Sequence, residues 1–139
     1  MVDALAECRR VLVPGGLLLD LRPFAGNWPL EAVQGPRTWP IGPLDDSQER
    51  PDDEAANAAI AQAVRVDLFW PERATTFEYA WYWDSLAELE TYIAERWTNV
   101  MRLSADTEAG AVRALAVAGP GACLRLRRGM RLGRYRRME

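Results

Sequence analysis

Four polar or aromatic residues near the N-terminus carry the side-chain chemistry that this sequence offers to a ligand. These residues are Asp20, Arg22, Asn27 and Trp28. They lie at and just after the end of a leucine-rich segment that we expect to be a strand. Ligands of open α/β sheets bind beyond the carboxyl ends of the strands, so these residues are candidate contacts to a small molecule. An alternative interpretation is that Trp28, together with Trp39, anchors an irregular loop to the core.

Several other kinds of chemistry are excluded by the residue types present. The chain has no histidine, which removes His-based triads, the commonest general base and the commonest metal ligand. Cys8 and Cys123 are far apart, and we expect buried free thiols rather than a disulfide or a metal site. An acidic patch holds Asp45, Asp46, Asp52, Asp53 and Glu54. Because the helix dipole favours negative charge at a helix start, capping of the alanine-rich segment 54–65 explains this patch better than metal binding.

The elements that would position the candidate residues begin with a helix and a strand. Leu5, Cys8, Val11 and Leu12 recur at three- and four-residue spacing behind Asp3, a suitable N-cap, which predicts a short helix. The Pro-Gly-Gly sequence at 14–16 then turns the chain. The leucines at 17, 18, 19 and 21 show no polar alternation, which is the pattern of an internal strand covered on both faces.

The segment from Pro23 to Pro51 changes in character, because it contains six of the nine prolines and few periodic apolar positions. This composition predicts a long ordered or semi-ordered loop over residues 23–51. Loops of this length in compact domains are often lids or binding segments.

The second half of the chain predicts strands and helices in turn. Alternation over 66–70 and again over 76–83, separated by Pro71 to Ala74, indicates a hairpin whose aromatic row is core rather than a stacking surface. A capping box at Ser85 to Glu88 opens a helix whose buried face holds Leu86, Leu89, Ile93 and Trp97. A last helix is expected from near Asp106, with an inner face of Val112, Leu115 and Ala116 and an end at Gly119-Pro120-Gly121.

The C-terminal tail is strongly basic. Residues 125–139 carry seven arginines and one acid, a net charge of +6, whereas residues 1–124 carry ten arginines and nineteen acids, a net charge of −9. Such asymmetry can indicate a nucleic-acid surface. Since Leu124 and Leu126 alternate with Arg125 and Arg127, we favour arginines on the solvated face of a half-buried strand or hairpin, where they protect an edge and pair with acids of the same chain or another subunit.

Length and composition indicate a single globular domain over residues 1–139. The 49% hydrophobic content argues against disorder, and no apolar run approaches the roughly 20 residues that span a bilayer. The N-terminus shows no basic-then-apolar signal-peptide pattern, so we expect a cytoplasmic protein with no membrane contact.

The stretch Arg9-Arg10-Val11-Leu12-Val13-Pro14-Gly15-Gly16-Leu17-Leu18-Leu19-Asp20 resembles the segment that opens the last parallel strand of class I S-adenosylmethionine-dependent methyltransferases. The resemblance continues through a variable segment, a strand, a helix and a closing β-ribbon. It implies a mixed α/β fold: a partial methyltransferase-type sheet with antiparallel strands and three or four covering helices. In that family a glycine-rich cofactor half precedes this segment, but here the segment begins eight residues after Met1. We therefore expect a substrate-side, C-terminal portion with no cofactor-binding residues of its own.

The resemblance leaves three functions open. The chain would supply the acceptor side of methyl transfer to a small molecule, with Asp20 as a candidate base, once a partner supplies S-adenosylmethionine. Alternatively, it is a catalytically silent dimeric domain for binding or regulation, or it binds nucleic acid through its arginine tail, which we do not favour. Without the strands of the cofactor half, the edge and one face of the Leu17 strand need a partner. That partner is a second copy of the chain or a separate N-terminal half.

Overall fold

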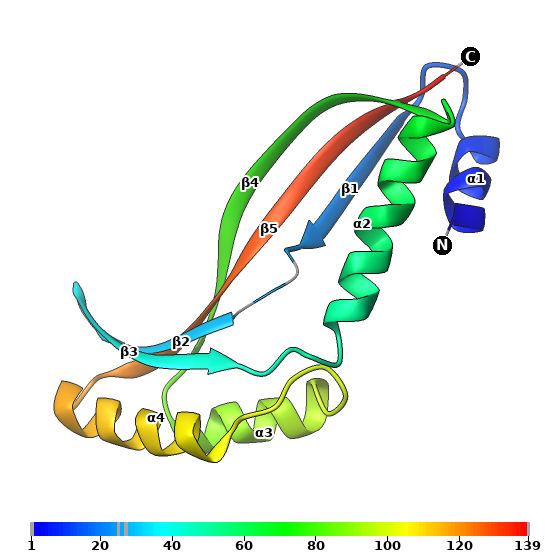
Figure 1. Cartoon of the computed structure of the whole chain (residues 1–139). Coiled ribbons are helices and arrows are strands. Elements are labelled where there is room, and N and C mark those ends of the chain that lie inside the picture. Colours follow the sequence, from blue (N-terminus) through cyan, green and yellow to red (C-terminus); the bar gives the residue numbers. More distant parts are fainter. Residues whose placement is uncertain (1, 25, 27, 139) are drawn as a thin grey trace. The chain divides into compact units, whose positions relative to one another are not determined.

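The computed structural model describes residues 2–24, 26 and 28–138 and confirms a mixed α/β fold (Figure 1). The elements are α1 (Val2–Val11), β1 (Leu17–Pro23), β2 (Trp28–Gln34), β3 (Arg37–Leu44), α2 (Arg50–Arg65), β4 (Phe69–Trp83), α3 (Leu86–Arg96), α4 (Ala105–Ala118) and β5 (Cys123–Arg137). Five strands form one sheet in the order β1-β5-β2-β3, and β4 also pairs with β5. Within the described residues, no helix is both long enough and apolar enough to cross a bilayer.

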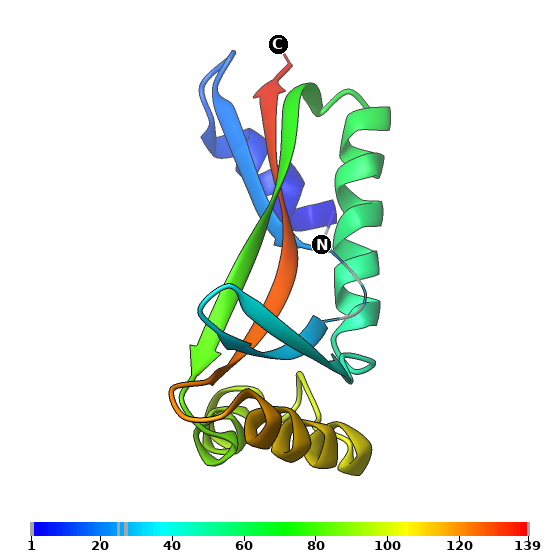
Figure 2. The same ribbon diagram turned by 90° about the vertical axis from the view of Figure 1, so that its left-hand side faces the viewer.

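The chain divides into two compact units. The first unit contains Met1–Ala25, Pro51–Phe77 and Gly129–Glu139, and the second contains Gly26–Arg50 and Glu78–Arg128. The long strands β4 and β5 contribute residues to both. In the first unit, α1 and α2 pack on the sheet around Ala63, Phe69 and Tyr135 (Figure 2).

The first helix and the turn after it form as predicted. Gly15 has a φ of +73°, a conformation that glycine adopts without steric cost. A β-carbon at Gly16 would lie 2.8 Å from the carbonyl oxygen of Val13, so the close approach of the chain to itself also requires glycine there. The carbonyl of Gly16 then accepts a hydrogen bond from the N–H of Arg137, which ties the start of β1 to the end of β5.

The leucine strand is not covered on both faces within the described part of this chain, and one edge and one face are open, as expected for a sheet that lacks the strands of a cofactor half. β1 pairs antiparallel with β5 from Leu17 opposite Arg136 to Pro23 opposite Met130, and no described strand pairs with its other edge. Leu18 packs with α1 and α2, but Leu17, Leu19 and Leu21 are 41%, 63% and 56% exposed. A uniform leucine run has no period, so it cannot show that one face lacks a cover within the same chain.

The predicted hairpin around Pro71 is also wrong, because β4 is one continuous strand. Residues 66–68, expected in the first strand of that hairpin, instead form the end of α2. Asp67 has a φ of +56°, and the N–H of Leu68 donates to the carbonyl of Ala63 at 2.9 Å. The N–H of Asp67 donates to Val64 at 3.2 Å, which completes the hydrogen-bond pattern of a Schellman cap. Aspartate tolerates this left-handed conformation better than most residues, so a glycine was not required to end the helix.

The segment 23–51 contains a β-hairpin rather than a long irregular loop. Gly35, with a φ of +55°, and Pro36 form the two-residue turn between β2 and β3. Pro40 and Pro43 are tolerated because, among the described strands, β3 pairs with β2 alone and is an edge strand. Pro29 of β2 precedes the stretch Leu30–Val33 that pairs with β5. A register shift between Leu30 and Glu31 marks a bulge in the same hairpin.

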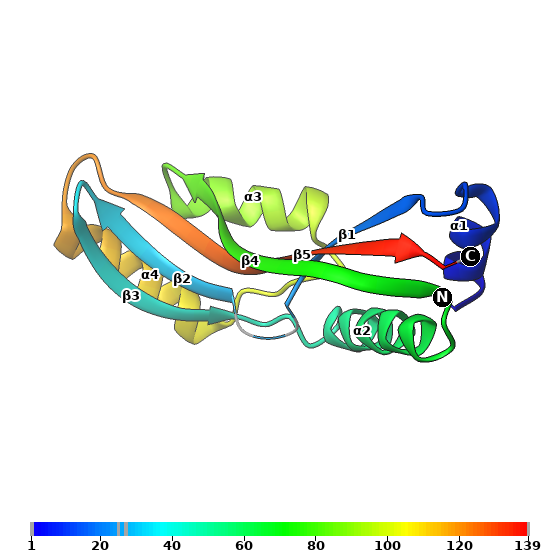
Figure 3. The ribbon, with the colours of Figure 1, turned by 90° about the horizontal axis from the view of Figure 1, so that it is seen from above.

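In the second unit, α3 and α4 pack beneath the β2–β3 hairpin (Figures 1 and 3). Ser85 caps the helix as predicted, with its Oγ accepting the N–H of Glu88 at 3.2 Å, while the Glu88 carboxylate accepts the N–H of Asp84 at 2.9 Å. Leu89 is fully buried, as predicted. The predicted inner face of α4 is right for Leu115, which packs against the core, but Val112 is 56% exposed and the buried positions are alanines 111, 114 and 118. Small residues let this helix approach the hairpin closely.

The arginine tail forms β5, an interior strand, and not a protected edge. Leu124 and Leu126 are fully buried, and β5 pairs with β1, β2 and β4. Among the described residues, carboxylates pair with five tail arginines, namely Arg125, Arg127, Arg128, Arg134 and Arg136. The predicted pairing with acids of the same chain is therefore confirmed.

Candidate functional site

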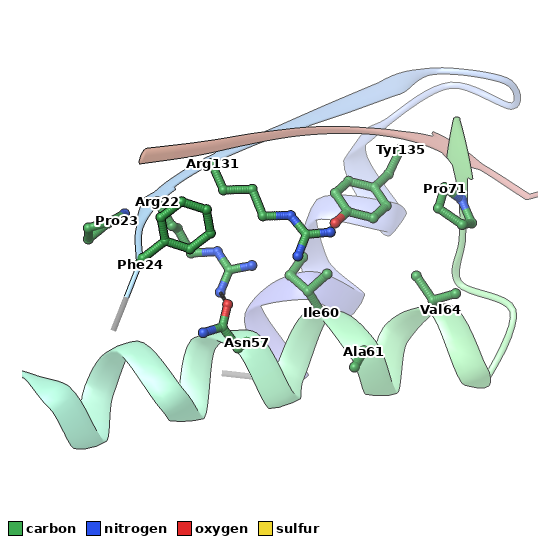
Figure 4. A pocket seen from close by; sticks show the side chains of 10 residues that line it. All are labelled: Arg22, Pro23, Phe24, Asn57, Ile60, Ala61, Val64, Pro71, Arg131 and Tyr135. Atoms are coloured by element: carbon green, nitrogen blue, oxygen red, sulfur yellow. Dashed lines mark hydrogen bonds between the residues drawn. The ribbon is translucent and has the colours of Figure 1, made fainter. Parts of the chain in front are cut away.

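The first unit contains a cavity of about 430 Å³ between α2 and the strands β1 and β5 (Figure 4). Its lining residues are Arg22, Pro23, Phe24, Asn57, Ile60, Ala61, Val64, Pro71, Arg131 and Tyr135. One wall is apolar and comes mainly from α2, while two guanidinium groups, an amide and a phenol supply polar contacts. Cavities of this size, mostly apolar with a few polar groups, are typical of small-molecule sites.

Alternate residues of β5 build the strand wall of this cavity. Gly129, Arg131, Gly133 and Tyr135 share one face of the strand. A β-carbon at Gly133 would lie 2.5 Å from Cε2 of Tyr135, and one at Gly129 would lie 2.5 Å from Cδ2 of Phe24. Both rings therefore lie across glycines. The absence of side chains at these two positions gives the rings their places on either side of Arg131.

Arg22 is held firmly at one end of the cavity. Its Nε donates to Oδ1 of Asp20 at 2.7 Å, and its Nη2 donates to Oδ2 at 2.7 Å, a bidentate pair. Its Nη1 donates to Oδ1 of Asn57 on α2 at 2.9 Å, the bond drawn in Figure 4. The structure therefore brings together two of the predicted residues, Asp20 and Arg22, and both oxygens of the candidate base are occupied by the arginine.

Arg131 has a different environment. It lies directly opposite Arg22 in the pairing of β1 with β5, and like charges in that position repel. In the part of the chain that the structure describes, no carboxylate or carbonyl bonds to the Arg131 guanidinium. Since Asp20 balances only Arg22, the cavity keeps one uncompensated positive charge. Figure 4 shows the Arg131 side chain reaching from β5 toward α2.

Of the other two predicted site residues, the structure describes Trp28, which does not line this cavity. Asn27 lies outside the described residues. Trp28 belongs to the second unit, where it is 1% exposed and stacks on Trp81 with ring centroids 5.4 Å apart. The guanidinium of Arg128 lies 3.5 Å from the centroid of the Trp28 ring, a cation–π contact. Trp28 is thus a core residue, which is the anchoring alternative.

The sequence interpretation missed Arg131, Tyr135, Phe24 and Asn57 as site residues. A usable signal was present in the spacing Gly129-x-Arg131-x-Gly133-x-Tyr135, which places two glycines beside an arginine on one strand face. Arg131 was assigned to a solvated face, and the residue is exposed as expected, but its place in the lining of a cavity was not foreseen.

The two cysteines and the acidic residues are candidates for a nucleophile and for a metal site. Cys8 and Cys123 are free, as predicted, and both are partly buried. Burial raises the pKa of the Cys123 thiol, and the nearby Asp84 adds to this effect, so the reactive thiolate is disfavoured. Within the described residues, no cluster of three or more acids or cysteines has metal-site geometry.

The fold and the cavity together define a mixed α/β protein with a positively charged, partly apolar pocket of small-molecule size. A comparison of the chain with known protein families, curated proteins and solved structures found no match. The resemblance to methyltransferases therefore stays a prediction.

Proposed function

We propose that this chain supplies the acceptor-substrate side of a methyltransferase-like protein and that a further polypeptide segment, which holds the methyl donor, pairs with the open edge of β1. The observation that carries this proposal is the state of β1. The helix, the Pro-Gly-Gly turn and the leucine strand occur together, and the described structure leaves that strand paired along one edge only.

The exposed face of β1 supports the same proposal. Leu19 lines a hollow of about 270 Å³ with Leu132 of β5 and with Arg73, Thr75 and Arg134. Fully burying one leucine contributes about 1.5–3 kcal/mol, so three exposed leucines on one strand represent a large unrealised stabilisation. A polypeptide that extended the sheet at β1 would satisfy the edge N–H and C=O groups and cover these side chains at the same time.

The residues of this chain do not fit S-adenosylmethionine. The methyl donor carries a positively charged sulfonium group, whereas the cavity of the first unit carries the uncompensated charge of Arg131 beside Arg22. The glycine turn at 14–16 precedes its strand, so its N–H groups do not open a helix toward a ligand. We therefore assign the donor to the partner segment and give this chain the tasks of binding and orienting the acceptor.

Two alternatives remain to be distinguished. A silent homodimer would use the same open edge of β1 but would not bind the donor. Nucleic-acid binding is less well supported, because the pairing of tail arginines with Glu31, Glu49 and Glu72 removes most of the charge that would contact phosphates. The pKa of the Glu72 carboxyl lies below its ordinary value, mainly because Arg136 donates a hydrogen bond to it.

The test compares donor binding by the chain alone and by the chain isolated with its natural partners. We expect calorimetry to detect no micromolar binding of S-adenosylmethionine by the purified chain. Tagged chain isolated from its cells of origin should bind radiolabelled donor in equilibrium dialysis. A Leu19→Glu variant isolated in the same way should lose this binding, because a charge on the leucine face blocks the added strand. Val117→Glu, at a residue 71% exposed on α4, is the matched control.

Micromolar donor binding by the purified chain would contradict the proposal, and so would native preparations that contain only a homodimer without bound donor. Circular dichroism of the Leu19→Glu variant checks that it is folded, which we expect because the Leu19 side chain is 63% exposed.

A further inference from the structure

We infer that the cavity of the first unit binds a small monoanion with a planar carboxylate and a flat apolar body, and that Arg131 is the residue that recognises the carboxylate. The inference that such a molecule binds here depends only on the residues of the cavity. Its role as methyl acceptor rests on the proposed function.

The charge of the cavity selects an anion with one negative charge. Three charged groups meet at this end of β1 and β5: Asp20, Arg22 and Arg131. The bidentate pair neutralises the first two and leaves the third. A guanidinium presents its donors in a planar fork that matches a carboxylate. A phosphate dianion would need a second available cation, and Arg22 is already committed to Asp20 and Asn57.

The remaining walls select the body of the ligand. The side chains of Ile60, Ala61 and Val64 come from α2, and Phe24 and Tyr135 place their rings at the strand wall. Both rings are fixed by close approach to glycines, so the cavity presents flat apolar surfaces at two places. Aromatic rings pack well against such surfaces, in stacked or edge-to-face arrangements. The hydroxyl of Tyr135, which also lines the cavity, is available as a neutral hydrogen-bond donor.

The geometry also argues that the arrangement is built and not incidental. A cross-strand pair of arginines is unfavourable, and an acid at position 131 would relieve it with a direct salt bridge to Arg22. The chain instead keeps both arginines, and Asp20 holds the first of them. The side chains of that pair are only 18% and 13% exposed, so Arg22 cannot turn away to solvent without losing its partners.

The experiment uses the full chain and two probes of the same shape. Isothermal titration calorimetry with 2-naphthoate and with the uncharged 2-naphthamide measures the contribution of the carboxylate. We expect the acid to bind at least about tenfold more tightly than the amide, in line with a charge-assisted bidentate pair. An Arg131→Gln variant should reduce this preference to about twofold or less. An Arg134→Gln variant, on the opposite face of the same strand, should keep it.

Binding of naphthoate that shows no preference over the amide would overturn the inference. The absence of binding by either probe would do so as well, and so would an undiminished preference in Arg131→Gln. Saturation-transfer NMR of bound naphthoate provides a second readout, because the probe protons should receive magnetisation from a site that Arg131→Gln empties. These outcomes do not depend on donor binding, so failure here is distinguishable from failure of the methyltransferase proposal.

Discussion

Replacement of Trp28 by alanine is expected to lower the free energy of unfolding by about 3–5 kcal/mol, the cost of truncating a fully buried aromatic residue. Trp28 contacts Trp97 edge-on at 5.5 Å as well as stacking on Trp81, so its removal leaves a large void in the second unit. The loss of the Arg128 contact adds to this cost, because a buried guanidinium loses the ring that it covers. Urea denaturation followed by circular dichroism measures the change.

The matched control is Trp70→Ala, at a tryptophan that is 60% exposed on β4. Its expected cost is below about 1 kcal/mol, because little apolar surface is returned to water. Similar losses from the two substitutions would show that Trp28 is not a core anchor and would return it to the group of candidate ligand contacts.

Replacement of Glu31 by alanine is expected to cost about 2–4 kcal/mol of unfolding free energy. The Glu31 side chain is 7% exposed, and its Oε1 lies 2.7 Å from Nη2 of Arg125 and 2.7 Å from Nε of Arg127. Burial alone would lower the pKa of Arg125, but the interactions with Glu31 and Tyr82 more than offset it, so the pKa is raised. Removing one partner of a buried pair typically costs about 3–5 kcal/mol. The lower range applies here because both arginines are about one-third exposed and regain some water.

Glu78→Ala tests whether burial is the reason. Glu78 also pairs with Arg127, at 3.1 Å, but its side chain is 55% exposed. Exposed pairs contribute about 0–1 kcal/mol, so this variant should be nearly as stable as the parent protein. Equal destabilisation by the two substitutions would mean that the burial of Glu31 between two arginines does not increase its contribution to the free energy of unfolding.

The elements that could be predicted from the sequence are those with local signals. The Pro-Gly-Gly turn, the Ser85 cap and the start of α4 each rest on residues within one turn of the boundary. The β2–β3 hairpin was missed because prolines disfavour strands in general, and the edge position of β3 makes Pro40 and Pro43 acceptable. Which strand lies at an edge depends on the whole sheet, so a short segment of sequence does not show it.

The site was predictable only in part for a similar reason. Arg22 follows the leucine strand and could be proposed from its place at the strand end. Arg131 became a site residue only through its pairing across from Arg22, a contact between residues more than a hundred positions apart. Trp28 is close to Arg22 in sequence, and that proximity suggested a shared role, but the chain places its ring in the core of the second unit.

The open edge of β1 also bears on how the protein must be produced and stored. The unpaired N–H and C=O groups of this edge, beside three exposed leucines, can pair with an extended segment of another chain, because backbone hydrogen bonding does not discriminate between sequences. Concentrated preparations of the isolated chain should become turbid with time. In the proposed complex, a partner segment that covers this edge would keep copies of the chain from pairing with one another.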